Sequence, residues 1–432
     1  MSQKQSNITE KMQVHTGNPM RIVYIVSQFP NLTETFIARE ITEIMCTGSK
    51  VIICTLRPIP QKDRPLGLEV KGAQTLRVPL NILTLFIAQI RALVIFPADY
   101  IRFWGEVIVA GFQKPKRFFH LIYLLAESAW LARQLDSYDI QYIHAHFLHS
   151  EAVVARWLGI MLRIPYGITT HTSNILLAQD LVRRVMIEAQ VRVGDTTQTL
   201  NVYEKVSGLS GKLIRNGINL DAFPIHQLPK GSCDNQSRTI LATGTLLPPK
   251  GFHVLIKACA LLHDQGLSFR CRIIGEGPER QRLEELILLN GLQNQIELPG
   301  AFPFNTLIEE YKKAAVFVMP SVMTPSGSDG LPTVLIEAMA TGVPVIGTRL
   351  AGIPDLVHHR ETGMMSEPED AKQLADCISE LFTDKGLCQK IATNGRTLIE
   401  TEYNLQKNVE SLLHMMELAI TSSQDQRNNP KK

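Results

Sequence analysis

The feature that most constrains the fold is an alternation between short β-branched runs and longer segments with helical spacing of apolar residues, which occurs twice along the chain. This alternation is typical of parallel sheets whose strands are joined by crossover helices. The chain has 432 residues, which suits two domains of roughly 200 residues better than one. We therefore predict an α/β protein built from two Rossmann-like domains.

In the first half, a polar loop at Ser27–Glu34 precedes a predicted helix from about Thr35 to Met45. A buried strand is also expected near Asp195–Leu200, although this segment is unusually rich in Thr and Gln. The other predicted strands of this half are Ile22–Val26, Val51–Leu56, Gln74–Val78, Ile140–His146 and Tyr166–Thr170.

The second half repeats the pattern. Its predicted strands are Thr239–Thr243, Phe269–Ile274, Val316–Met319 and Val343–Gly347, and its helices are Phe252–His263, one from Glu279, Thr333–Ala340 and a last one near Asn404–Ile420. We expect a flexible N-terminus at 1–20, an N-terminal domain at 21–215, a C-terminal domain at 216–400, a C-terminal helix at 401–420 and a disordered tail at 421–432.

Charge differs between the two halves. Residues 1–215 carry 24 Lys and Arg against 16 Asp and Glu, whereas residues 216–432 carry 20 against 25. A basic first half and an acidic second half indicate two domains with different partners. The seven cysteines are scattered without a C-x-x-C pair, which argues against a zinc site and a disulfide framework and favours a reducing cytosol.

Residues 79–135 form a long apolar stretch that we expect to be helical, with Lys114, Lys116 and Arg117 near its middle. One interpretation is ordinary packing against the sheet; the other is a basic and aromatic face that contacts a membrane surface or a lipid-linked acceptor. The first twenty residues lack the apolar core of a secretion signal, and no apolar run reaches the ~18 residues of a membrane span. We expect a cytoplasmic protein, with peripheral contact at the inner face of the membrane as the second interpretation.

The segment from Pro320 to Ala340 carries the clearest chemistry. A strand ends at Pro320, a loop of small residues follows, and a helix begins near Pro332 or Thr333. The N-terminus of that helix offers amide groups and a positive dipole end that suit a phosphate. Glu337 follows about one turn later, where a carboxylate could accept hydrogen bonds from ribose hydroxyls; the alternative is a capped crossover helix with a solvated Glu.

This segment resembles the Glu-x7-Glu signature of family-4 retaining glycosyltransferases, with Asp329 and Glu337 at the two acidic positions. The resemblance implies that Asp329 and the neighbouring amides hold the donor sugar and its phosphates, and that Glu337 holds the ribose. It also implies the GT-B fold, with two Rossmann-like domains that face a central cleft. The remaining residues that it assigns to donor binding in this loop are Gly330, Leu331, Thr333 and Val334.

A second match lies at Thr243–Phe252, which is similar to the segment after the first strand of the family's donor domain. Lys250 falls on the lysine that neutralises the diphosphate, whereas Thr245 replaces the family's arginine. Gly244, Gly251, Gly275 and Gly277 would let the backbone approach the donor, and Phe302 borders the nucleotide base. Arg215–Phe223 is similar to the family's hinge.

In the first half, Phe29–Ile37 resembles a loop of exopolysaccharide-building members, including colanic-acid-type transferases. It places Thr33, Glu34 and Thr35 on the acceptor side, although Thr33 or Thr35 could equally be a helix cap with Glu34 a first-turn acid.

Thr169–Thr172 resembles a cleft segment whose histidine, His171, approaches the reacting sugar; Asn174 stands where the family has Asp. The alternative is a satisfied core histidine. His144 and His146 alternate on one strand, but the sequence shows no third ligand near them, so we expect no metal site.

The resemblance implies transfer of a sugar with retention from a nucleotide-sugar co-substrate to a saccharide or lipid-linked saccharide, in exopolysaccharide or cell-surface polysaccharide synthesis. Retention in this family is usually explained by front-side attack. The resemblance implies that here Lys250 and the helix N-terminus stabilise the leaving diphosphate. No Asp-x-Asp motif occurs, so we expect neither a metal nor another cofactor, and no nucleic-acid partner. Two alternatives stay open: a sugar-nucleotide-binding protein without catalysis, motivated by Thr245, Asp329 and Asn174, and a nucleotide-sugar epimerase.

Overall fold

The computed structural model describes residues 19–31, 34–59, 70–113, 115–171, 179–223, 238–325, 327 and 330–428. The chain forms two compact units that divide between Arg215 and Asn216, and from Leu405 onward it returns to the first unit. We call these the first unit and the second unit and consider each by itself.

The first unit contains a seven-stranded parallel sheet in the order β3-β2-β1-β4-β5-β6-β7. The chain first adds β2 and β3 on one side of β1 and then adds β4 to β7 on the other side, so the direction of strand addition reverses between β1 and β4. In open α/β sheets, ligands bind beyond the carboxyl ends of the strands at such a switch point. The strands are β1 (Arg21–Val26), β2 (Lys50–Thr55), β3 (Gln74–Arg77), β4 (Tyr142–His146), β5 (Tyr166–Thr170), β6 (Val191–Gly194) and β7 (Lys212–Leu213).

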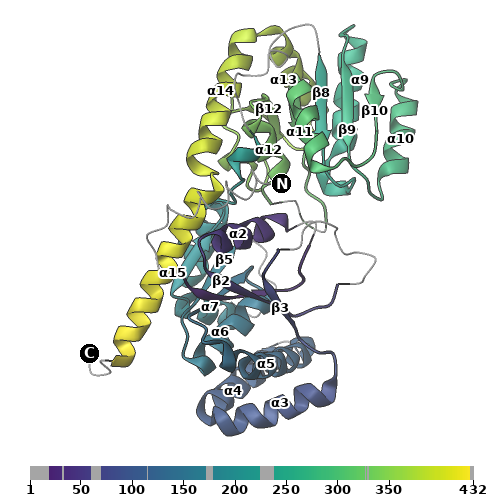
Figure 1. Cartoon of the computed structure of the whole chain (residues 1–432). Coiled ribbons are helices and arrows are strands. Elements are labelled where there is room, and N and C mark those ends of the chain that lie inside the picture. Colours follow the sequence, from purple (N-terminus) through teal and green to yellow (C-terminus); the bar gives the residue numbers. More distant parts are fainter. Residues whose placement is uncertain are drawn as a thin grey trace. The chain divides into compact units, whose positions relative to one another are not determined.

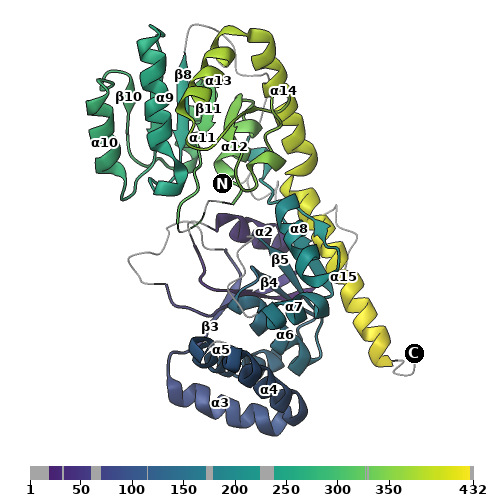
Figure 2. The same ribbon diagram turned by 180° about the vertical axis from the view of Figure 1, so that it is seen from behind.

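Helices cover both faces of this sheet. α2 (Thr35–Cys46) and α15 (Leu405–Asn428) pack on the face that includes Ile22 and Tyr24, whereas the helices from α3 to α7 belong to the core on the opposite face, which includes Val23 and Ile25. α3 and α4 contact α5 on the side away from the sheet and lie at one end of the unit (Figures 1 and 2). The bounds of these helices are α3 (Ile82–Ile95), α4 (Pro97–Gln113), α5 (Pro115–Leu135), α6 (Ser150–Leu162) and α7 (Gln179–Glu188).

The segment predicted as a buried strand near Asp195–Leu200 is instead the start of a helix. β6 ends at Gly194, and α8 (Thr197–Ser207) follows. The Thr196 side chain accepts from the Thr199 amide at 3.1 Å, and the Thr199 hydroxyl accepts from the Thr196 amide at 3.1 Å. The threonines therefore form a capping box, which explains a composition that suits a strand poorly.

The predicted tail at 421–432 is helical where it is described, because α15 continues to Asn428. Between Leu405 and Pro430 the sequence contains no glycine or proline, so neither residue type ends the helix at 420.

The second unit contains a six-stranded parallel sheet in the order β10-β9-β8-β11-β12-β13, with its switch point between β8 and β11. One core lies under α9 (Phe252–Asp264), α10 (Arg280–Leu289) and α13 (Ala371–Thr383). The other lies under α11 (Phe304–Lys313) and α12 (Thr333–Ala340), and α14 (Lys385–Glu402) contributes to both. The strands are β8 (Thr239–Thr243), β9 (Arg270–Ile274), β10 (Ile296–Glu297), β11 (Val316–Met319), β12 (Val345–Thr348) and β13 (Met364–Ser366).

Two sequence expectations concern the chain as a whole. In the described part of the chain, no helix has both the length and the apolar character required to cross a membrane. Cys54, Cys259, Cys271 and Cys377 carry free thiols, but Cys388 is disulfide-bonded, which the scattered cysteine spacing did not predict.

Candidate functional site

At the switch point of the second unit, glycines bring three loops into backbone contact. A Cβ at Gly275, after β9, would lie 1.9 Å from the carbonyl oxygen of Gly244, after β8. A Cβ at Gly251 would lie 1.8 Å from the carbonyl oxygen of Pro320, after β11, and one at Gly277 would lie 2.5 Å from that of Leu246. A side chain at any of these three positions would force the loops apart, so glycine allows them to meet at this edge of the sheet.

Lys250 lies within this edge. It ends a short 3₁₀ turn, η5 (Pro248–Lys250), and its side-chain carbons approach to 3.5 Å of the position that a Gly244 Cβ would occupy. Its side chain is half-buried, whereas the Thr245 side chain is exposed. The Lys250 side chain therefore lies against Gly244 at this edge.

The helix α12 begins beside the same edge. Pro332 precedes it and provides no side-chain cap, and Thr333 and Val334 in its first turn are half-buried. Leu331 is half-buried and Gly330 is exposed, while Asp329 lies outside the described residues.

Glu337, one turn into α12, is only 4% exposed. The Tyr311 hydroxyl donates to Glu337 Oε2 at 3.3 Å and lies 3.3 Å from Thr243 Oγ1 at the end of β8. Tyr311 thus ties the Glu337 carboxylate to the switch point, a connection that no sequence spacing indicated.

Phe302 lies in the same unit, between β10 and α11, and is half-buried. The Arg272 guanidinium carbon is 5.8 Å from its ring centroid. The second unit thus brings together the described residues that the sequence predicts for donor binding, after β8, β9 and β11 and at the start of α12.

The first unit lines its switch point with side chains instead. His171, directly after β5, is 7% exposed, and its Nδ1 lies 3.0 Å from Asp195 Oδ2. His171 Nε2 lies 2.7 Å from His146 Nδ1, and His146 Nε2 lies 3.1 Å from Glu40 Oε1. These four residues form a continuous chain of hydrogen bonds from α2 across β4 and β5 to the end of β6.

This chain of hydrogen bonds constrains where protons lie. Three contacts link two imidazoles and two carboxylates, so three protons are needed, whereas two neutral imidazoles carry only two. Full hydrogen bonding therefore needs a third proton, which either an imidazole or a carboxyl group can carry. Burial acts against the charge on Glu40, but His146 and the Tyr24 hydroxyl, which donates to Glu40 at 2.6 Å, lower the pKa of Glu40 to about 2. Burial lowers the pKa of His146 despite the neighbouring Glu40.

A third histidine borders this chain without joining it. His144 Nε2 lies 2.9 Å from Thr169 Oγ1, and burial followed by the neighbouring His146 lowers the pKa of His144 to about 3. Ligand atoms of Glu40, His144 and His146 all lie within 4.8 Å of one another, which is within the range of a metal site. The expectation that no third ligand lies nearby is therefore wrong, because Glu40 comes from a helix about a hundred residues earlier.

Glu34 and Thr35, two of the residues predicted to contact the acceptor, lie at the start of α2. Thr35 is the first helical residue and Glu34 precedes it without a capping side-chain bond, so the interpretation of Thr35 as a cap is wrong. Burial raises the pKa of Glu34, and the nearby His171 opposes that rise. Thr33 and Asn174 lie outside the described residues.

Comparison with known proteins finds a family that matches part of the chain. The glycosyl transferases group 1 family matches residues 227–398, which include the glycine-lined edge, Lys250 and α12. The matched segment lies within the second unit and makes up about two fifths of the chain. The chain's sequence is 36% identical over 184 residues to WcaL of Escherichia coli, a glycosyltransferase named for colanic acid biosynthesis, across 41% of this chain and 45% of WcaL. The chain thus matches less than half the length of that relative.

A longer match extends over most of the chain. The amylovoran biosynthesis glycosyltransferase AmsK of Erwinia amylovora is 24% identical over 421 residues, which cover 92% of this chain and 99% of AmsK. HepE of Anabaena in complex with UDP superposes with a TM-score of 0.69 at 14% identity, across 93% of this chain and all of that one. Sucrose-phosphate synthase of Thermosynechococcus elongatus superposes with a TM-score of 0.68 at 19% identity, across 93% and 100%. The chain therefore has the GT-B fold, as the sequence predicted.

Proposed function

We propose that this chain transfers a hexose, with retention, from a nucleotide-sugar to a saccharide or lipid-linked saccharide in exopolysaccharide or cell-surface polysaccharide synthesis. The observation that carries the proposal is the convergence of the Gly244, Gly251 and Gly275 loops with Lys250 and the start of α12 at one switch point. The HepE structures with UDP and with UDP-glucose support a nucleotide-sugar donor. The names of WcaL and AmsK, which refer to colanic acid and amylovoran biosynthesis, support the product class.

In the proposed mechanism, the second unit binds the donor and the first unit the acceptor. Lys250 and the first amides of α12 stabilise the charge that develops on the leaving diphosphate, and the residues of the Asp329–Val334 loop hold the sugar and phosphates. Glu337 accepts hydrogen bonds from the ribose. The leaving phosphate removes the acceptor proton, so no protein nucleophile is required.

In the first unit, His171 contacts the reacting sugar, and Thr33, Glu34 and Thr35 contact the acceptor. Asp195 and His146 hold the His171 ring from both nitrogens, which fixes its orientation. We further propose that the chain works without a metal in the cytoplasm, in peripheral contact with a membrane through its basic first unit.

The experiment incubates the chain with labelled UDP-, GDP- and ADP-sugars, with and without lipid-linked saccharide, before and after EDTA. The proposal expects an acceptor-dependent product with the donor's anomeric configuration, unchanged by EDTA. An altered sugar nucleotide formed without acceptor would favour the epimerase. Binding without any product would favour the non-catalytic protein that the Thr245 position motivates.

A further inference from the structure

The exposed surface of α3 is almost entirely apolar. Ile82, Phe86, Ile90 and Val94 are 80%, 57%, 51% and 75% exposed, and their spacing of four residues places them on one face of the helix. The opposite face packs inward through Leu85, Ala88 and Ala92. A soluble protein rarely leaves so large a continuous apolar surface without a partner.

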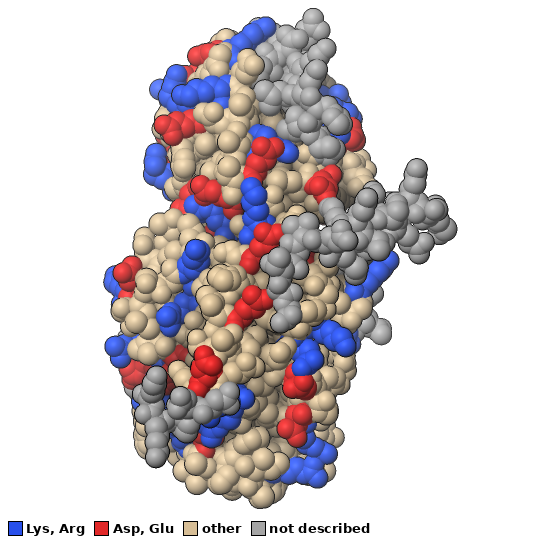
Figure 3. Space-filling view, turned by 60° about the vertical axis from the view of Figure 1, so that its left-hand side comes forward, with Lys and Arg blue, Asp and Glu red and all other residues tan. Residues whose placement is uncertain are grey.

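The neighbouring helix α4 continues this surface. Ile101, Ile108, Val109 and Phe112 are 63%, 44%, 59% and 86% exposed and recur at helical spacing. α3 and α4 contact each other, and both lie at the same end of the first unit (Figure 1). The lower end of the space-filling view, where these helices lie, is mostly uncharged (Figure 3). We call the exposed side chains of α3 and α4 the apolar face.

Charges around the apolar face have one predominant sign. α3 contains no acidic residue, and its one charged residue, Arg91, is exposed. The acids of α4 are turned inward and paired: Asp99 with Arg163 at 2.8 Å, and Glu106 with the fully buried Arg156 at 2.7 Å. The apolar face therefore presents a cation at its edge while its acids are neutralised from behind.

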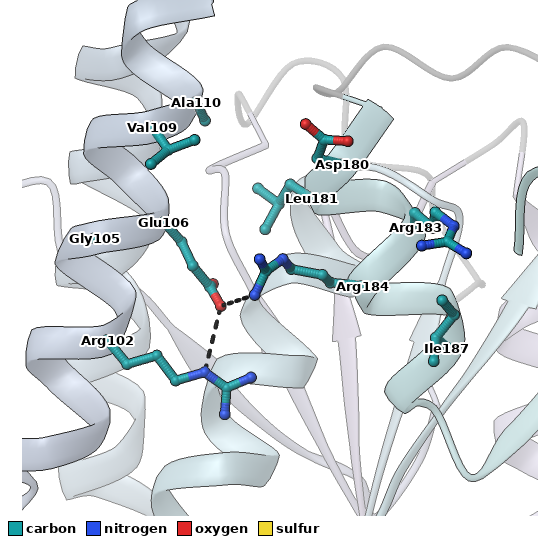
Figure 4. A pocket seen from close by; sticks show the side chains of 10 residues that line it. All are labelled: Arg102, Gly105, Glu106, Val109, Ala110, Asp180, Leu181, Arg183, Arg184 and Ile187. Atoms are coloured by element: carbon teal, nitrogen blue, oxygen red, sulfur yellow. Dashed lines mark ion pairs between the residues drawn. The ribbon is translucent and has the colours of Figure 1, made fainter.

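A cavity of about 410 Å³ opens where α4 meets α7. Val109 belongs both to the apolar face and to the cavity wall, which also carries Arg102, Arg183 and Arg184 (Figure 4). Glu106 bridges Arg102 and Arg184 at 3.6 and 3.7 Å, and Asp180 is the other acid of the wall. Guanidinium groups beside an apolar surface match a bilayer, in which phosphates lie directly above hydrocarbon.

We propose that the apolar face of α3 and α4 docks on a bilayer that contains anionic lipids. The apolar side chains enter the boundary between headgroups and acyl chains, and Arg91, Arg183 and the other cavity arginines contact lipid phosphates. α3 has 14 residues, too few to span a membrane, so the helices lie in the plane of the surface. This inference specifies the membrane contact of the proposed function and rests on that part of it alone.

The test is co-sedimentation of the full chain with phosphatidylcholine vesicles, with and without phosphatidylglycerol. We expect binding to the anionic vesicles that weakens with salt. The triple variant Phe86→Gln, Ile90→Gln, Val94→Gln should bind at least about tenfold more weakly, because each substitution removes apolar area that docking would bury. Each of Arg91→Glu and Arg183→Glu should cost about fivefold or more on anionic vesicles only.

Matched controls come from the second unit, where Leu288 and Leu289 are 63% and 82% exposed. Leu288→Gln with Leu289→Gln should leave vesicle binding unchanged. Donor-induced thermal stabilisation should be equal in the triple variant and the parent, which separates a docking defect from a folding defect and from failure of the transfer proposal.

Three results would overturn the proposal. The chain could fail to bind either vesicle, or the triple variant could bind as tightly as its parent. The chain could also be a dimer without lipid that the triple variant converts to a monomer, which would show that a second copy covers the apolar face.

Discussion

The two units share one strand order around their switch points but line those points with different chemistry. In the second unit, Gly244, Gly251 and Gly275 bring backbones together and leave Lys250 and the α12 amides at the edge. In the first unit, buried imidazoles and carboxylates fill the corresponding edge and bond one another. The difference shows how one parallel-sheet scaffold can offer either a cationic, backbone-lined surface or a side-chain network that holds protons.

The largest effect expected from this comparison is at Lys250. Lys250→Ala removes the cation that we propose to stabilise the diphosphate, so kcat/KM for transfer should fall about 10²- to 10³-fold. Lys257, exposed on the neighbouring helix α9, is the matched control, and Lys257→Ala should retain parental kcat/KM. Equal activity of the two variants would remove Lys250 from the mechanism.

Next in size is the glycine contact. Gly251 and Gly266 both have positive φ, +65° and +75°, but a Cβ at Gly266 meets no atom within 4 Å. Alanine strains both backbones alike, so the contact with Pro320 should make Gly251→Ala about 3 kcal/mol more destabilising than Gly266→Ala. Urea unfolding of both variants measures this difference, and similar losses would show that the loops separate at little cost.

A smaller effect is expected from a buried acid in the first unit. Burial raises the pKa of Glu151 to about 7. The folded state therefore holds its proton more tightly than the unfolded chain, so stability is full below about pH 4.5 and declines as pH rises through 7. Glu151→Gln should reduce the decline between pH 5 and pH 8 by about 2 kcal/mol. The free energy of unfolding of parent and variant is measured by denaturation at the two pH values. An equal decline in both proteins would contradict this account.

The smallest expected effect concerns the histidine chain. Asp195→Asn removes the charge that holds His171 Nδ1 at 3.0 Å, so kcat should fall about tenfold, with little change in donor KM. A matched variant, Asp180→Asn, alters an exposed acid of the same unit and should leave kcat unchanged. A loss confined to donor KM would place His171 outside the reacting centre.

Sequence reasoning succeeded where local residue types determine the structure. β-branched runs predicted the strands around both switch points. The glycines were predicted to let the backbone approach the donor, and the structure shows that Gly251, Gly275 and Gly277 let the loops approach one another. It failed at Asp195–Leu200, where threonine side chains cap a helix instead of extending a strand.

The side-chain network was out of reach for a different reason. Glu40 joins His146 from 106 residues away and Asp195 joins His171 from 24 residues away, each on another element, so no local spacing in the sequence links them. Tyr311, which positions Glu337 from α11, was missed for the same reason.

The most direct test of the central claim is the thermal stability of the parent and of Glu337→Gln with UDP-, GDP- and ADP-sugars. Ligand that binds only the folded state raises the melting temperature with its concentration. The account predicts a rise with one nucleotide class that is absent or strongly reduced in Glu337→Gln, whose side chain keeps its size and an acceptor for Tyr311. No rise with any donor, or an equal rise in both proteins, would contradict a nucleotide-sugar site at the switch point of the second unit.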